Sequence, residues 1–294
     1  MLRFVAQWQD QDAILIAWPH KNTDWQPWIE DINTTYLELV SKISNITPML
    51  ILVDDSINLD ELKFALINKN INLSNLIFIN LNYDDTWARD FGVISLVDDL
   101  DSNLTQPLNF TFNAWGDKFE SNQDNLINSK LESKNIFSKA LINIDFILEG
   151  GSIETDGIGT LLTSEICLLN PNRNYTLTKQ QIEKSLIKHL NVDRVLWLKN
   201  GHLIGDDTDA HIDTLARFVN ENTIVFQGCQ DQDDDHFETL NKMKAELESF
   251  RTKQNKPYNL IELPLPEAQF DDNNNRLPAS YVNFLISHNH IFVP

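Results

Sequence analysis

The sequence has few cysteines and no long apolar run. Its two cysteines, Cys167 and Cys229, cannot form the disulfide framework that a secreted chain of 294 residues would use. No run approaches the roughly 18 apolar residues of a membrane span, and Gln7, Asp10 and Asp12 interrupt the apolar region that a signal peptide needs. These absences favour the reducing cytoplasm and exclude a membrane partner.

Positive charge is also scarce. The chain carries 23 Lys and Arg residues against 43 Asp and Glu residues, which gives a formal net charge of −20. Such a surface repels the phosphates of nucleic acids and the anionic head groups of lipids. Small cationic molecules are therefore the expected partners, unless the acidity serves solubility alone.

Two further absences concern the class of enzyme and the number of domains. The sequence contains neither the glycine pattern of dinucleotide-binding sites nor a phosphate-cradling Walker loop, which counts against nucleotide enzymes. No linker rich in Pro, Gly or Ser divides the chain, and its composition does not shift along its length. We therefore expect residues 1–294 to form a single domain.

The chain does contain enough apolar residues, 42% of the total, for a buried core. Short apolar runs predict strands at residues 13–18, 48–53, 76–79, 93–97 and 108–112. Helical spacing of apolar residues predicts helices at residues 25–43, 59–68, 178–190 and 236–250. Thr178 and Gln181 fit a capping box at the start of the third helix. Polar composition predicts loops at residues 98–105, 116–134 and 230–235, and it allows a helical turn in the second. The alternation indicates a mixed α/β fold.

Residues 84–92 combine three carboxylates, a tryptophan and an arginine. Asp90 could hold a cation, with the ring of Trp87 within cation–π reach. Alternatively, Arg89 pairs with one of the aspartates and Trp87 belongs to the core. The residue types alone leave both interpretations open.

Glu149 ends an apolar run and precedes Gly150 and Gly151. Glycines allow the backbone to approach other groups closely. A carboxylate at the end of a buried strand is costly unless it is paired, so Glu149 is either functional or salt-bridged.

Residues 205–218 mix four aspartates with His211. If this run is extended near its middle, Asp209, His211 and Asp213 share one face, which could hold a cation and move protons. Three alternatives remain: a metal-chelating loop, which lacks the calcium-loop pattern, a core histidine, and a solvated acidic loop. Asp90, Glu149 and His211 recur at intervals of about sixty residues, which weakly favours a radial fold of repeated units.

Taken together, these segments resemble the family of agmatine deiminases and bacterial peptidyl-arginine deiminases, which modify guanidine groups. The matching stretches are residues 17–20, 85–92, 149–152, 163–174, 207–218 and 277–284. The resemblance implies a five-bladed α/β propeller of ββαβ-like units, the pentein fold, with a central active site and, in this chain, an incomplete final blade.

The resemblance also implies roles for individual residues. Asp90 and Asp213 match the carboxylates that grip the guanidinium, His211 the general acid/base, and Glu149 the acid that orients it. Trp87 matches a wall against which the substrate packs. By their places in the matching stretches, Trp18, Asp85 and Asp209 are further candidates for the site.

In that family a cysteine thiolate attacks the guanidinium carbon, ammonia leaves, and water hydrolyses the thiouronium intermediate. The nucleophile lies near the family's C-terminus, in a segment expected after Pro294. Cys167 sits in an apolar run and Cys229 precedes an acidic one, so neither is expected to replace it. The chemistry needs no metal and no organic cofactor.

The leading functional prediction is conversion of agmatine to N-carbamoylputrescine, a step toward putrescine and the polyamines. The alternatives are deimination of peptidyl arginine, and guanidinium binding or an interaction role without turnover. The family often forms oligomers, which allows a homo-oligomer here, although the sequence identifies no interface. Ala210 departs from the family's usual glycine, which matters if the backbone there needs a positive φ.

Overall fold

A computed structural model describes residues 1–98, 100–102 and 104–294 of the chain. Its strands are β1 (Leu2–Phe4), β2 (Ile14–Ala17), β3 (Met49–Val53), β4 (Leu76–Asn80), β5 (Ile94–Asp98), β6 (Thr105–Thr111), β7 (Ile142–Ile147), β8 (Ile153–Thr155), β9 (Thr160–Ser164), β10 (Arg194–Leu198), β11 (Ala216–Asn220), β12 (Thr223–Gln227), β13 (Asn259–Leu263), β14 (Leu285–Ser287) and β15 (His290–Phe292). Its α-helices are α1 (Ile29–Ile43), α2 (Leu59–Asn68), α3 (Ala88–Phe91), α4 (Ala114–Asp117), α5 (Ile127–Ser133), α6 (Glu165–Leu168), α7 (Lys179–Leu190) and α8 (Phe237–Ser249). The short 3-10 helices are η1 (Gln26–Trp28), η2 (Leu73–Asn75), η3 (Asp124–Leu126), η4 (Gly150–Ser152) and η5 (Ile212–Thr214).

The strongly periodic segments form the predicted elements. The five predicted strands correspond to β2, β3, β4, β5 and β6, and the four predicted helices to α1, α2, α7 and α8. Helix α7 begins with the predicted capping box: the side chain of Thr178 accepts from the backbone N–H of Gln181, and Gln181 reaches back to the cap. Ile182, Leu186 and Leu190, at helical spacing, are buried against the sheet that contains Leu161.

The polar loop predicted at residues 116–134 is wrong in its second half. Residues 124–126 form η3 and residues 127–133 form α5. Ile127 and Leu131, four residues apart, bury one side of this helix beside Leu52 and Phe112, and this tertiary packing outweighs the polar composition. The loop predicted at residues 98–105 includes residues 99 and 103, which lie outside the described residues.

The described strands form five separate sheets. Three successive units share one order: an antiparallel pair, a helix, and a strand parallel to the second strand of the pair. These units are β5-β6-α5-β7, β8-β9-α7-β10 and β11-β12-α8-β13. The N-terminal sheet β2-β3-β4 is parallel throughout, and β14 pairs with β15. The mixed α/β class is confirmed, whereas the five-bladed propeller, its incomplete last blade and the single domain stay predictions.

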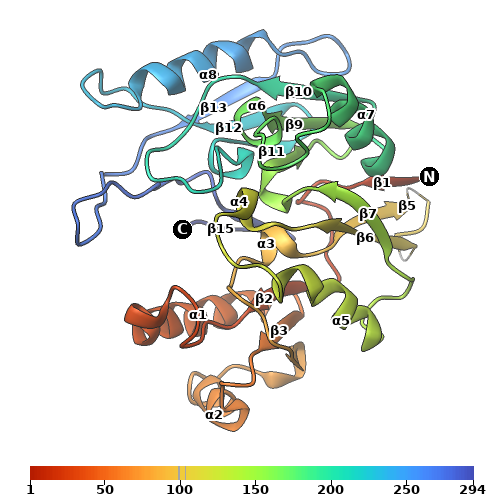
Figure 1. The fold of residues 1–294 in the computed structure, drawn as a ribbon, viewed down its shortest axis with the longest axis vertical. Helices are drawn as coiled ribbons and strands as arrows, with labels where there is room; N and C mark the ends of the chain where they lie inside the picture. The colour runs from red at the N-terminus through yellow and green to blue at the C-terminus, as the bar shows by residue number, and fades with distance from the viewer. Residues whose placement is uncertain (99, 103) are drawn as a thin grey trace.

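The longer helices α1, α2, α5, α7 and α8 lie toward the outside of the molecule, whereas the short α3 and α4 lie near its middle (Figure 1). The short element η4 contacts both α3 and η5, although residues 91 and 150, and again 152 and 212, are far apart in the sequence. Each of these elements carries one of the predicted site segments. Within the described part of the chain, no helix is both long and apolar enough to cross a bilayer.

Candidate functional site

Three side chains converge on Gly151, one from α3 and two from the segment that contains η5. A Cβ atom on this glycine would lie 2.6 Å from Nδ1 of His211, 2.7 Å from Oδ1 of Asp90 and 2.8 Å from Oδ2 of Asp213. These separations are shorter than any side chain allows, so only glycine permits this gathering. Gly150 is equally constrained, because a Cβ there would lie 2.1 Å from the backbone oxygen of Arg89. The close backbone approach predicted for this glycine pair is confirmed.

Asp90 is held by two donors on its two oxygens. The backbone N–H of Gly151 donates to Oδ1 at 2.8 Å, and Nε1 of Trp115 donates to Oδ2 at 3.0 Å. Oδ1 also lies 3.6 Å from Nδ1 of His211. Asp90 is buried in α3, whereas Arg89 turns away and lies 3.8 Å from Glu154. Arg89 therefore does not neutralise Asp90, which removes the simplest structural explanation of this segment.

His211 and Asp213 lie on a tight loop rather than on an extended strand. Asp209 and Ala210 both have φ of 65°, in the left-handed region, and Asp213 lies within η5. The carboxylate of Asp206 fixes this turn, accepting from the backbone N–H of Thr208 at 2.9 Å and of Ala210 at 2.7 Å. The predicted alternation along a strand is therefore wrong. His211 and Asp213 reach the same place, while Asp209 points elsewhere.

Asp213 has an unusual electrostatic environment. Burial raises the pKa of its carboxyl group above the ordinary value of 3.8, and the negative charge of Asp90 raises it further, whereas His211 lowers it. Two carboxylates so close together repel each other unless a cation lies between them. Such perturbed groups are typical of functional sites.

Glu149 follows β7 and is fully buried. Nε of Arg173 donates to its two oxygens at 2.8 and 3.1 Å. The guanidinium of Arg173 also donates to Asp209 at 2.8 Å and to the backbone oxygen of Thr208 at 3.0 Å. Glu149 is therefore salt-bridged, and Arg173 ties it to the loop that carries His211. Sequence reasoning gave Arg173 no role; the signal available was the need of a buried Glu149 for a partner.

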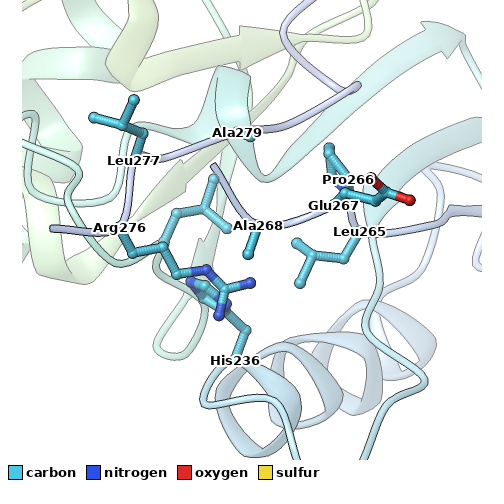
Figure 2. Close-up of a pocket in the computed structure, with 9 residues that line it drawn as sticks. His236, Leu265, Pro266, Glu267, Ala268, Arg276, Leu277 and Ala279 are labelled. Atoms are coloured by element: carbon cyan, nitrogen blue, oxygen red, sulfur yellow. The ribbon is translucent and has the colours of Figure 1, made fainter. Parts of the chain in front are cut away.

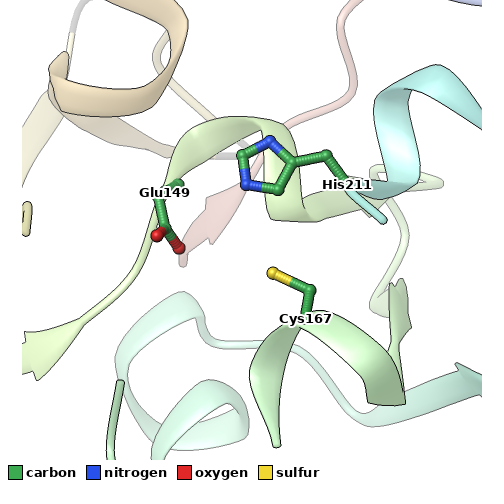
Figure 3. A group of neighbouring side chains, drawn as sticks. All are labelled: Glu149, Cys167 and His211. Atoms are coloured by element: carbon green, nitrogen blue, oxygen red, sulfur yellow. The ribbon is translucent and has the colours of Figure 1, made fainter. Parts of the chain in front are cut away.

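Cys167 of α6 packs in the core, as predicted, but it also faces the site. Its sulfur, a carboxylate oxygen of Glu149 and a ring nitrogen of His211 all lie within 4.8 Å of one another (Figure 3). Burial raises the pKa of the Cys167 thiol well above its ordinary value. Cys229 lies in the other large core cluster, and burial followed by the charge of Asp234 raises its thiol pKa as well.

Trp87 lies next to Trp115, the residue that donates to Asp90. Trp87 is 47% exposed, whereas Asp90 is 8% exposed. Its ring lies 6.2 Å from that of Trp25 and 6.3 Å from that of Trp115. An exposed aromatic face next to a buried carboxylate suits a flat cation.

Asp85 does not join the three side chains at Gly151. Its side chain accepts from the backbone and hydroxyl groups of Thr86, at 2.7 and 3.3 Å. Thr86 in turn accepts from Nε1 of Trp25 at 2.9 Å. Asp85 therefore helps to position Trp25, whose ring lies next to that of Trp87.

The two remaining candidates also have other partners. Trp18 is buried in the cluster around α1, donates to Asn33 at 2.6 Å, and lines a cavity of about 180 Å³ with His20. Asp209 accepts from Arg173 and Lys118, each at 2.8 Å. Burial tends to raise the pKa of Asp209, but these two cations lower it overall. Both residues stay candidates for positioning rather than for direct contact.

Comparison with known proteins identifies the family of the chain. The family model of Porphyromonas-type peptidyl-arginine deiminases matches residues 3–294. The chain belongs to this family. Agmatine deiminase from Pseudomonas syringae is 28% identical over 98% of this chain and 82% of its own length.

Solved structures of the family have the same fold. A substrate-bound serine variant of C. jejuni agmatine deiminase superposes with a TM-score of 0.89, at 39% identity, covering 100% of this chain and 83% of that one. The agmatine deiminase of Enterococcus faecalis superposes with a TM-score of 0.84, at 25% identity and with the same coverage. The predicted family and its hydrolytic deiminase class are therefore confirmed.

Proposed function

We propose that this protein is an agmatine deiminase that hydrolyses the guanidinium group of agmatine to N-carbamoylputrescine and ammonia. The observation that carries the proposal is the convergence of Asp90, His211 and Asp213 on Gly151. Two crowded carboxylates with no arginine between them among the described residues suit a planar cation that offers N–H donors along two edges. Membership in the family and the names of its relatives support the same reaction.

The residues take distinct parts in the proposed reaction. Asp90 and Asp213 accept the guanidinium N–H donors, and Trp87 covers the face of the cation. A cysteine thiolate attacks the guanidinium carbon, the C–N bond to one terminal nitrogen breaks, and His211 gives the departing ammonia its proton. Water, deprotonated by His211, then attacks the thiouronium carbon and releases the thiolate and a urea group. Glu149, held by Arg173, keeps a negative charge near His211.

The nucleophile is proposed to come from the C-terminal segment of the family, where the fifth unit of a pentein propeller would close around the axis. The two thiols within residues 1–294 are poor substitutes, because the pKa of each is raised. This observation also supports a second function for these residues alone, namely guanidinium binding without turnover.

Agmatine is preferred over peptidyl arginine on the basis of charge. Agmatine is a dication, and the formal net charge of the chain is −20, which favours its approach. Rates measured side by side on agmatine and on an arginyl peptide test the choice; faster turnover of the peptide would reverse it.

The experiment has two readouts. Calorimetry measures agmatine binding by residues 1–294, and ammonia release is measured on the same chain extended by the C-terminal segment of a relative. Asp213→Asn should abolish both, whereas Asp193→Asn, at an exposed position paired with Lys253, should change neither. If the chain without substitutions does not bind agmatine, and its extended form does not release ammonia, the proposal is wrong.

A further inference from the structure

His211 uses one ring nitrogen and leaves the other without a partner. Nδ1 lies 3.6 Å from Asp90. Nε2 is buried and has no hydrogen-bond partner among the described residues. Figure 3 shows the ring edge that carries Nε2 turned toward the space between Glu149 and Cys167. A buried polar atom of this kind calls for a ligand, because buried nitrogen atoms are nearly always satisfied.

The atoms around this space are a sulfur, an imidazole nitrogen and a carboxylate oxygen. Because all three lie within 4.8 Å of one another, some point is no more than about 2.8 Å from each of them. Zinc bonds to sulfur are about 2.3 Å long and those to histidine nitrogen about 2.0 Å. Inward side-chain movements of roughly 0.5 to 0.8 Å would therefore complete three bonds.

Glu149 retains capacity for a metal despite its ion pair. Both contacts from Arg173 come from the single Nε–H group, and a carboxylate has about four lone-pair positions. Three protein ligands of this type, with a fourth position left open, are a common zinc arrangement.

The charge of the surroundings also favours a cation. Glu149, Asp90 and Asp213 lie around His211. Among the described residues, Arg173 forms an ion pair with Glu149, and Arg89 and Arg217 act on Asp213 without forming an ion pair with it. The excess of carboxylates is what the proposed guanidinium would offset, and a divalent ion offsets it equally well. The thiolate selects soft ions such as Zn²⁺ over Mg²⁺ or Ca²⁺.

We propose that Glu149, Cys167 and His211 form a binding site for a soft divalent cation of the Zn²⁺ class. Binding forms an S–metal bond and releases the thiol proton of Cys167 to solvent. An ion held here takes Nε2 of His211 and the charge of Glu149 out of use, so it competes with a guanidinium ligand. The competition rests on the proposed function, whereas the metal binding itself does not.

The test uses Co²⁺ as a spectroscopic probe and Zn²⁺ in calorimetry, both with residues 1–294. A thiolate-to-Co²⁺ charge-transfer band is expected for the unaltered chain and for Cys229→Ser, the matched control at the other buried cysteine. Cys167→Ser should lose the band and bind Zn²⁺ at least tenfold more weakly. Absence of the band in the unaltered chain, or its loss in Cys229→Ser alone, would overturn the proposal.

Cys167 is a core residue, so a second variant guards against misfolding. His211→Gln should weaken Zn²⁺ binding by a similar factor while the chain still melts cooperatively; unchanged affinity would contradict the site. Zn²⁺ should also raise the apparent Kd for agmatine. If Zn²⁺ binds and agmatine does not, the proposed function fails and the metal site stands. If agmatine binds and Zn²⁺ does not, the metal site is wrong and the proposed function stands.

Discussion

Two groups of side chains in this molecule each place a buried histidine beside an aspartate, but they differ in organisation. One is the central group at Gly151, formed by Asp90, His211 and Asp213. The other is the peripheral group formed by Asp234, His236 and Arg276. Both histidines are buried and both lie near a carboxylate.

The side chains of the peripheral group form hydrogen bonds with one another and with a nearby backbone N–H group. Asp234 accepts from Arg276 at 2.7 and 3.1 Å and from Nδ1 of His236 at 2.8 Å, while Nε2 of His236 accepts from the backbone N–H of Ile204 at 2.9 Å. Burial tends to raise the pKa of Asp234, but the hydrogen bonds from Arg276 and His236 bring it down to about 2. The guanidinium lies beside the imidazole at a cavity of about 10 Å³, too small for more than one water (Figure 2).

The central group is left incomplete. His211 has an unpartnered Nε2 among the described residues, Asp213 has a raised pKa, and the loop before His211 has left-handed residues at positions 209 and 210. A buried histidine beside an aspartate thus belongs to a fully paired network in one place and to an incompletely paired one in the other. Unmet hydrogen bonds and backbone strain, rather than residue type, therefore distinguish the candidate functional site from the peripheral group.

Replacing each histidine by glutamine should produce the largest difference between the two groups. His211→Gln should lower ammonia release by the extended chain by roughly 10²- to 10⁴-fold, because general acid/base catalysis contributes about that much. His236→Gln should leave the rate within about twofold and reduce the free energy of unfolding by about 1–3 kcal/mol, because Asp234 and Ile204 lose buried partners. Initial rates and urea unfolding on both variants check this, and equal losses of activity would erase the distinction.

The two arginines give the next largest contrast. Arg173→Met should reduce the free energy of unfolding by roughly 3–5 kcal/mol, because it leaves Glu149 buried and unpaired. The loss should be larger than for Arg276→Met, since Arg276 and Asp234 are 14% and 16% exposed and water can partly replace the lost contacts. Arg173→Met should also weaken agmatine binding, because the loop carrying His211 loses its tie to Glu149. Urea unfolding and calorimetry on both variants measure these losses. A larger loss of free energy of unfolding in Arg276→Met than in Arg173→Met would contradict the ranking.

Periodicity and turn chemistry predicted the elements, but not the geometry of the site. Helix α7 could be predicted because its capping box and its apolar spacing agree. Helix α5 could not, because the burial of Ile127 and Leu131 depends on neighbours distant in the sequence. The extended interpretation of residues 209–213 failed because the carboxylate of Asp206 builds a turn there. Cys167 was correctly expected in the core, yet its approach to His211 comes from the packing of α6, which the local sequence does not encode.

Asp124 differs from both groups, because it has no cationic partner among the residues that the structure describes. Asp124 accepts backbone N–H groups of Asp84 and Asp85, and burial raises its pKa from 3.8 to about 7. A carboxyl whose pKa is raised on folding contributes stability below its unfolded pKa and loses that contribution as pH rises through the folded value. Stability should therefore fall between pH 4 and 7, by at most about 1.4 kcal/mol per pH unit from this group. Asp124→Asn should flatten this part of the pH profile of Tm, and an unchanged profile would assign the slope to other groups.

The smallest expected effect concerns the strain that sets the central loop apart. Ala210 has φ of 65°, whereas no residue of the peripheral 230–236 loop has a positive φ. A left-handed alanine costs about 1–2 kcal/mol, and glycine adds about 0.5–1 kcal/mol of unfolded-state entropy that folding must overcome. Ala210→Gly should therefore raise the free energy of unfolding by roughly 0.5–1 kcal/mol. Ala140→Gly, at an exposed position without positive φ, should lower it slightly. Urea unfolding of both variants measures the difference; if both glycines destabilise alike, the turn at residue 210 is relaxed, and the strain that distinguishes the central loop rests on Asp209 alone.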